Sequence, residues 1–146
     1  MPRASNSIVI DRPCGEVFDF LADSENDRQW RPGVLDIKRM SGDGIGAVYK
    51  QGVKGPFGRR IDADFERSEL EAPSLIGFRA LSGPVRPAGR YELVDEGGRT
   101  RVTFSLEAEP RGLSKLISPL IARTMGSEVR ALDRLREVLA QRTPGP

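Results

Sequence analysis

The strongest constraint on the fold is a change of hydrophobic period along the chain. From Val34 to Glu109, apolar and polar residues alternate in successive short segments, as is typical of β-strands. Turn sequences rich in glycine, proline and serine separate the segments, and no helical pattern lies between them. Strands in direct succession indicate an antiparallel meander, because parallel neighbours need a long crossover. The segments are VLDIKRM, AVYKQGV, RIDADFERSEL, SLIGFRAL, GRYELV and TRVTFSLEAE.

Other patterns flank this block on both sides. Alternation over Ser5–Asp11 predicts a first strand, and residues 13–30 predict two short helices. From about residue 112 to residue 141, apolar residues recur at helical spacing, and Pro119 is expected to kink this helix or mark its start. We therefore predict an α+β helix-grip fold, in which a curved antiparallel seven-stranded sheet wraps a long C-terminal helix and two short helices follow the first strand.

The length and composition bound the class of protein. The chain of 146 residues fits one domain over residues 1–142 with a frayed tail at 143–146. It has no apolar run that would span a bilayer, no signal-peptide pattern and one cysteine, so we expect a cytoplasmic protein without integral membrane association. The net charge of +2 is dispersed, which argues against nucleic-acid binding.

The absence of histidine excludes several chemistries. Histidine is the commonest general base and metal ligand, and the chain contains 0. We expect no metal site and no cofactor, and we assign no catalytic residue. The single cysteine, Cys14, stands at a predicted helix start, where a thiol pKa can fall, but the chain has no histidine to activate it. Cys14 is therefore interpreted as part of the helix.

Alternation along the strands assigns their faces. In RIDADFERSEL, one face carries Ile61, Ala63 and Phe65, and carboxylates at period two are expected on the solvent face. The same rule turns apolar and aromatic residues of the later strands inward, and it turns Tyr49 and Gln51 inward with Val48 as the rival. Such an inner wall, apolar with a few polar groups, suits a pocket for a hydrophobic ligand.

The predicted ligand-binding residues come from strands, loops and the last helix. Long Gly/Pro loops at one end of the meander indicate the pocket mouth, with Phe57 and Ile117 on its rim. Trp30 is either a hydrophobic plug or a pocket wall. Glu128 is either solvated or the one carboxylate facing the cavity, where its pKa would rise. The full predicted set is Trp30, Tyr49, Gln51, Phe57, Phe65, Phe78, Ala80, Tyr91, Phe104, Ile117, Met125, Glu128 and Leu132.

Four motifs give the chain a resemblance to a known superfamily. These are SIVIDRPCGEVFDFLAD, QWRPGV, GDGIGAVYK and GGRTRVTFSLE, in this order. The chain resembles the START-like, or Bet v 1-like, helix-grip superfamily, and within it the polyketide cyclase/dehydrase and lipid-transport (SRPBCC) proteins. The resemblance implies a lipid, quinone or polyketide-like ligand. It leaves open a cyclase or dehydratase, in which Tyr49, Tyr91 or Arg79 would act as proton donor or clamp. The oligomeric state is also open, with a homodimer among the alternatives.

Overall fold

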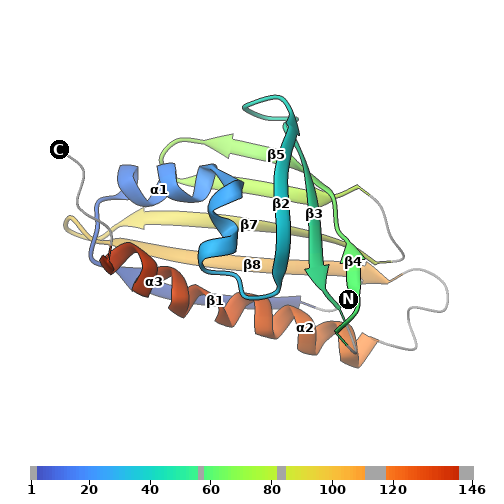
Figure 1. Ribbon diagram of the computed structural model, residues 1–146. Coiled ribbons are helices and arrows are strands. Elements are labelled where there is room, and N and C mark those ends of the chain that lie inside the picture. The colour runs from blue at the N-terminus through green and yellow to red at the C-terminus, as the bar shows by residue number, and fades with distance from the viewer. Residues whose placement is uncertain (1–2, 56–57, 82–84, 111–117, 142–146) are drawn as a thin grey trace.

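A single antiparallel sheet forms one layer of the molecule (Figure 1). The computed structural model describes residues 3–55, 58–81, 85–110 and 118–141. The sheet has the order β1-β8-β7-β6-β5-β3-β2, and β4 pairs only with β3. Its strands are β1 (Arg3–Ile10), β2 (Val34–Ser41), β3 (Val48–Lys54), β4 (Arg60–Asp62), β5 (Phe65–Glu71), β6 (Leu75–Ala80), β7 (Val85–Asp95) and β8 (Thr100–Pro110).

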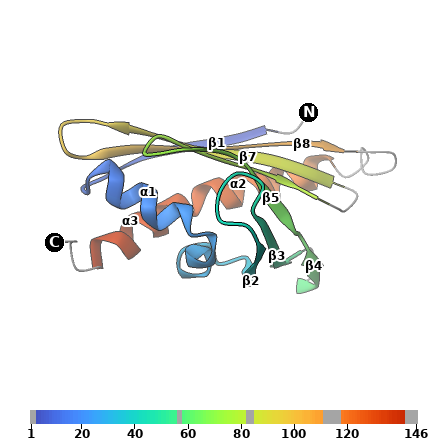
Figure 2. The same cartoon turned by 90° about the horizontal axis from the view of Figure 1, so that it is seen from above.

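The helices cover one face of this sheet. Figure 2 shows the long strands as one layer, with all helices beneath it and β2, β3 and β4 curling down beside them. The helical elements are α1 (Cys14–Ala22), the 3₁₀ helix η1 (Ser24–Gln29), α2 (Ser118–Arg130) and α3 (Leu132–Gln141). The predicted helix-grip architecture is therefore confirmed, with the C-terminal helices held against the concave face.

The segment predicted as one strand over residues 60–70 is divided into β4 and β5. The Ala63 N–H donates to the Gln51 carbonyl at 2.8 Å, and Asp64 Oδ1 accepts the Gln51 N–H at 3.1 Å. The Asp64 side chain thus replaces a backbone acceptor of the ladder, although β4 and β5 keep the same register with β3. Ile61 pairs with Val53 and so lies on the inner face as predicted, but it is 43% exposed because β4 covers only the end of β3. Within the described residues, the sheet therefore has 8 strands.

The C-terminal helix is likewise divided, at Ala131. The Ala131 N–H donates to the Glu128 carbonyl at 3.1 Å, and the Arg134 N–H donates to the Ala131 carbonyl at 2.9 Å. Both bonds span three residues, as in a 3₁₀ turn, and they separate α2 from α3. Pro119 lies in the first turn of α2, which agrees with the predicted helix start.

The core consists of two apolar clusters on the concave side. The larger cluster joins the inward residues of β1, β7 and β8 to α1, α2 and α3. The smaller contains Ala47, Tyr49 and Phe65 on the curled part of the sheet. Phe78 of β6 packs against both clusters and is only partly buried itself. The region around Phe78 therefore joins the flat and the curled parts of the sheet.

Candidate functional site

A continuous row of aromatic rings follows the concave face across the sheet. The rings of Tyr91 and Phe104 stack with centroids 4.5 Å apart, and those of Tyr49 and Phe65 stack at 5.1 Å. Phe78 connects the two pairs, with its centroid 6.2 Å from Tyr91 and 5.6 Å from Phe65. Each of these residues was predicted to face inward, and the register of the antiparallel strands brings them side by side.

The helical side of the interior is apolar as well. Trp30 follows η1, is 1% exposed and meets Tyr91 and Phe104 edge to face at 6.1 and 6.2 Å. Met125 of α2 and Leu132 of α3 are 5% and 0% exposed. The structure therefore places these three predicted residues in the larger core cluster.

Phe78 and Ala80 of β6 are less covered than these neighbours. Both are half-buried, whereas most other predicted residues on the strands are fully buried. The end of β6 at Ala80 lies beside the start of β5, because Phe65 and Ala80 are paired. Phe57 and Ile117, the predicted rim, lie outside the described residues.

A charged cluster lies between η1, β3 and α2, with Arg31 at its centre. Arg31 Nε and Nη2 donate to the two carboxylate oxygens of Glu128 at 3.0 and 3.1 Å. Arg31 Nη1 donates to Asp27 Oδ2 at 2.8 Å and to Gln51 Oε1 at 3.0 Å. The cluster ties the segment after η1 to both the sheet and the C-terminal helix. Glu128 thus faces the interior, with Arg31 as a partner that the sequence did not reveal.

Gln51 is held in place by the bend between β4 and β5. Its Nε2 donates to the Ala63 carbonyl at 3.1 Å, which leaves Oε1 to accept from Arg31. Gln51 is 5% exposed, and both its amide nitrogen and its amide oxygen are hydrogen-bonded in the interior. The strand break therefore has a consequence for the site, because it positions the amide that binds Arg31.

Asp27 is the carboxylate of this cluster whose pKa is raised. Burial raises the pKa of Asp27 to about 6, although Arg31 acts in the opposite direction and Glu128 adds to the rise. Arg31 donates two hydrogen bonds to Glu128 and one to Asp27, so the negative charge of Asp27 is the less compensated of the two. Burial lowers the pKa of Arg31, but Glu128 and Asp27 outweigh it and hold that pKa above its ordinary value. Asp27 can therefore exchange a proton near neutral pH while Arg31 keeps its charge.

Tyr91 lies close enough to this cluster to sense its charges. Burial raises the pKa of Tyr91 well above its ordinary value, and the charge of Asp27 acts in the same direction. Its phenol consequently keeps its proton at physiological pH. It can donate a hydrogen bond but does not serve as an anionic base.

Arg67 is a second buried guanidinium on the concave face. It is 3% exposed, and its guanidinium carbon lies 5.6 Å from the centroid of the Tyr49 ring. Arg67 Nη2 donates to Ser24 Oγ at 2.5 Å, but the buried Nη1 has no hydrogen-bond partner within the described part of the chain. No carboxylate among the described residues forms an ion pair with it. The buried indole Nε1 of Trp30 also lacks an acceptor there.

Sequence reasoning missed three of these polar residues. Arg67 could have been found, because continuing the alternation from Phe65 by two residues places it on the inner face. Asp27 and Arg31 stand at the i,i+4 spacing of a helical ion pair, but nothing in the sequence shows that Glu128, about a hundred residues away, also binds Arg31. Arg79 was a candidate clamp for an enzyme, but it is exposed and pairs with Glu66 on the outer face, so that assignment is wrong.

A groove of about 390 Å³ lies elsewhere, where β1 leads into α1 beside α3. None of the predicted ligand-binding residues contributes to it. Its lining residues are Val9, Ile10, Asp11, Arg12, Arg99, Arg136 and Ala140. Cys14, at the first position of α1, is partly buried against the larger core cluster. The predicted interior pocket thus remains a prediction, distinct from this groove.

Two classes of feature are absent from the described residues. Within residues 3–55, 58–81, 85–110 and 118–141, no group of three or more histidine, cysteine or acidic side chains is arranged to hold a metal ion. None of the helices in those ranges is long and apolar enough to cross a membrane.

Solved structures with the same fold share little sequence with this chain. A protein from Thermus thermophilus superposes with a TM-score of 0.75 at 20% identity, covering 97% of this chain and 100% of its own. The Zhui aromatase/cyclase from Streptomyces sp. R1128 gives 0.74 at 15% identity, over 93% and 94% of the two chains. A STAR-related lipid transfer protein from Xanthomonas axonopodis gives 0.68 at 20%, over 94% and 85%.

The sequence itself supports a narrower assignment. No curated protein sequence matches the chain. The family model described as polyketide cyclase/dehydrase and lipid transport matches residues 1–140, which is nearly the whole chain. This protein therefore belongs to the polyketide cyclase/dehydrase and lipid transport family.

Proposed function

We propose that the protein binds a small hydrophobic molecule, such as a lipid, quinone or polyketide, between the sheet and the C-terminal helices. One oxygen of this ligand accepts a hydrogen bond from Arg67 Nη1. The observation that carries the proposal is the buried Nη1, which has no partner among the described residues. A buried N–H donor without an acceptor is costly, and a ligand carbonyl or carboxylate would offset that cost.

The surroundings of Arg67 support an aromatic or conjugated ligand. The guanidinium lies over Tyr49, which stacks on Phe65, and Phe78 continues the row with part of its surface uncovered. Flat apolar walls with one charged donor at a fixed place are the ordinary composition of a small-molecule site. The family includes lipid transport, and one structural neighbour is named a lipid transfer protein.

The test uses 8-anilino-1-naphthalenesulfonate, a fluorescent dye with an aromatic body and one anionic group. Wild-type protein should bind it with a rise in fluorescence. Arg67→Met should weaken binding by about tenfold or more, because a hydrogen bond to a charged donor contributes about 1.5–3 kcal/mol. The control is Arg79→Met, which removes an exposed guanidinium from the outer face of β6. It should change the dye affinity by less than about twofold.

Two outcomes would contradict the proposal. One is a folded wild-type protein that takes up no dye, and the other is an Arg67→Met variant that binds dye as wild type does. Circular dichroism of each variant controls for folding. Native mass spectrometry of the freshly purified protein then identifies any co-purified ligand by mass.

An enzymatic function is the second candidate, and Asp27 is the observation that favours it. A buried carboxyl with a pKa of about 6 can give and take a proton near neutral pH, as general acid-base catalysis requires. Tyr91 would donate a hydrogen bond to a carbonyl while the walls orient a flexible poly-ketone chain. Conversion of a short poly-β-ketone thioester by wild type but not by Asp27→Asn would favour the enzyme. Binding without conversion would favour the carrier.

A further inference from the structure

The outer face of the curled part of the sheet carries an ordered pattern of charges. Lys38 of β2 stands directly opposite Lys50 of β3, and Lys54 of β3 stands opposite Arg60 of β4. The neighbouring residues Tyr49 and Gln51 are buried on the inner face, so Lys50 and Lys54 point outward. All four cations are exposed.

Two carboxylates on this face, those of Asp36 and Asp62, pair with a single arginine. Arg60 Nη2 lies 2.9 Å from Asp36 Oδ1, and Arg60 Nη1 lies 3.4 Å from Asp62 Oδ1. The guanidinium lies flat over Gly52, where a Cβ atom would come within 2.2 Å of Nη1. The remaining cations, Lys38, Lys50 and Lys54, have no ion pair among the described residues. We call these three residues the lysine patch.

The lysine patch is unfavourable for the isolated protein. Like charges placed directly opposite on neighbouring strands repel each other and destabilise the pairing. Here Lys38 and Lys50 form such a pair, and Lys54 lies on the same face beyond the row that carries Asp36 and Asp62, whose carboxylates are paired with Arg60. An anionic surface would remove this repulsion, since its charges would lie against all of the lysines at once.

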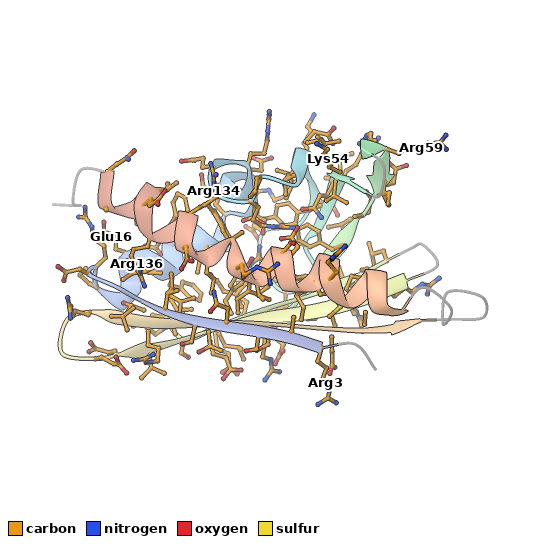
Figure 3. All side chains as sticks on the ribbon, turned by 90° about the horizontal axis from the view of Figure 1, so that it is seen from below. Arg3, Glu16, Lys54, Arg59, Arg134 and Arg136 are labelled. Carbon is orange, nitrogen blue, oxygen red and sulfur yellow. The ribbon has the colours of Figure 1, made fainter. Side chains whose placement is uncertain are left out.

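We propose that the lysine patch docks the protein on an anionic lipid membrane, from which a hydrophobic ligand enters or leaves. The exchange of a ligand with the membrane rests on the proposed function, but the binding of the protein to the membrane does not. Lysines are compact point charges suited to a headgroup layer, where each contributes to attraction. Figure 3 shows Lys54 and Arg59 at the same end of the molecule, with Arg59 reaching beyond the ribbon.

Apolar side chains beside the patch favour a membrane over a nucleic acid. Met40 of β2 is 57% exposed, and Ile45 in the turn that follows is 69% exposed. Exposed aliphatic side chains can enter the boundary between headgroups and acyl chains. The outer positions of β2, β3 and β4 carry no aromatic ring on which a base could stack.

Vesicle flotation tests the proposal with full-length protein. Wild type should float with vesicles of phosphatidylcholine and phosphatidylglycerol at about 3:1, and not with phosphatidylcholine alone. The binding should disappear at about 0.5 M NaCl, where the screening length is only a few ångströms. The triple variant K38Q/K50Q/K54Q should bind anionic vesicles about 100-fold more weakly, or about fivefold for each lysine.

The control variant R86Q/R123Q/R134Q removes the same net charge at exposed positions elsewhere. Its vesicle binding should stay within about threefold of wild type. Equal losses in the two triple variants, or no wild-type binding to anionic vesicles, would overturn the proposal. So would tighter binding to a single-stranded oligonucleotide than to the vesicles.

Dye binding in the absence of vesicles separates this proposal from the proposed function. The K38Q/K50Q/K54Q variant should keep its affinity for 8-anilino-1-naphthalenesulfonate within about twofold. Vesicle binding by a protein that takes up no dye would refute the interior site alone. Dye uptake by a protein that ignores anionic vesicles would refute the docking surface alone.

Discussion

At the scale of single residues, the interior contains two guanidinium groups that differ in their hydrogen bonding. Arg31 makes four hydrogen bonds, which go to Glu128, Asp27 and Gln51. Arg67 uses one nitrogen on Ser24 and leaves the other without an acceptor among the described residues. A fully bonded group holds the fold together, whereas an unbonded donor is available to a ligand. This difference supports the proposal that Arg67 binds the ligand, whereas Arg31 stabilises the fold.

The protonation of Asp27 should make stability depend on pH. Its folded pKa of about 6 lies above the ordinary value of 3.8, so the folded state binds the proton more tightly. Stability from this group is therefore fully present below the unfolded pKa and is lost as the pH rises through about 6. The loss is about 3 kcal/mol at most for a shift of this size.

Asp27→Asn should remove this dependence, because asparagine keeps the acceptor oxygen without titrating. The free energy of unfolding, measured in urea from about pH 4 to pH 8, should fall less steeply for the variant than for wild type. The two curves should differ in slope between the ordinary value of 3.8 and the folded pKa of about 6. Parallel curves for the two proteins would mean that Asp27 does not titrate in this window.

At the scale of elements, the salt bridge between Arg31 and Glu128 connects α2 to the segment between η1 and β2. The side chains of Arg31 and Glu128 are 11% and 21% exposed, so the pair is largely removed from solvent. Removing one partner of such a pair leaves the other buried and poorly compensated. Because Arg31 also binds Gln51 of β3, the pair connects α2 to the curled side of the molecule.

Glu128→Gln should therefore destabilise the protein by about 1–3 kcal/mol, less than for a fully buried pair. Thermal melts followed by circular dichroism measure this loss. Glu137→Gln, an exposed position on α3, is the control and should change stability by less than about 0.5 kcal/mol. The Glu128→Gln variant should also lower the pKa of Asp27, because the charge of Glu128 raises it. An unchanged melt would show that the pair contributes nothing to holding α2.

The sequence predicted the elements well where periodicity is local, and less well where long-range contacts decide. Alternation placed Tyr49, Tyr91 and Phe104 correctly on the inner face. It did not reveal the interruption between β4 and β5, where the Asp64 side chain accepts the Gln51 N–H in place of a backbone carbonyl. The break at Ala131 was also missed, since the apolar stripe continues past it through buried leucines of α3. Within the charged cluster, Asp27 and Arg31 are four residues apart, but their contacts with Gln51 and Glu128 join distant parts of the sequence, which no local pattern reveals.

At the scale of the whole molecule, the register brings the ends of several strands to the same end of the sheet. Val85 pairs with Pro110, so β7 begins where β8 ends, and Ala80 at the end of β6 pairs with Phe65. The pairing of Tyr49 with Phe65 sends the rest of β3 toward the same end. Figure 1 shows β4 and the ends of these strands together, opposite the turn between β7 and β8. The half-buried Phe78 and Ala80 approach this end, where we proposed the pocket mouth.

Ala80→Trp distinguishes an open interior at this end from a packed one. Ala80 is small, half-buried and on the same face as Phe78. If space lies in front of it, the indole should fill that space, abolish uptake of 8-anilino-1-naphthalenesulfonate and leave a cooperative melt with little loss of stability. If the region is packed, overpacking should cost about 1–3 kcal/mol and lower the melting temperature by many degrees.

The matched control is Arg79→Trp, which places the same ring one residue away on the outer face. It should leave dye uptake unchanged, and any effect it has on the melt reports the cost of a tryptophan on β6 itself. Dye uptake that survives Ala80→Trp would place the binding site away from Ala80. The proposed site would then shift to the Tyr49–Phe65 stack and Arg67, where the guanidinium over the Tyr49 ring still offers its unbonded Nη1.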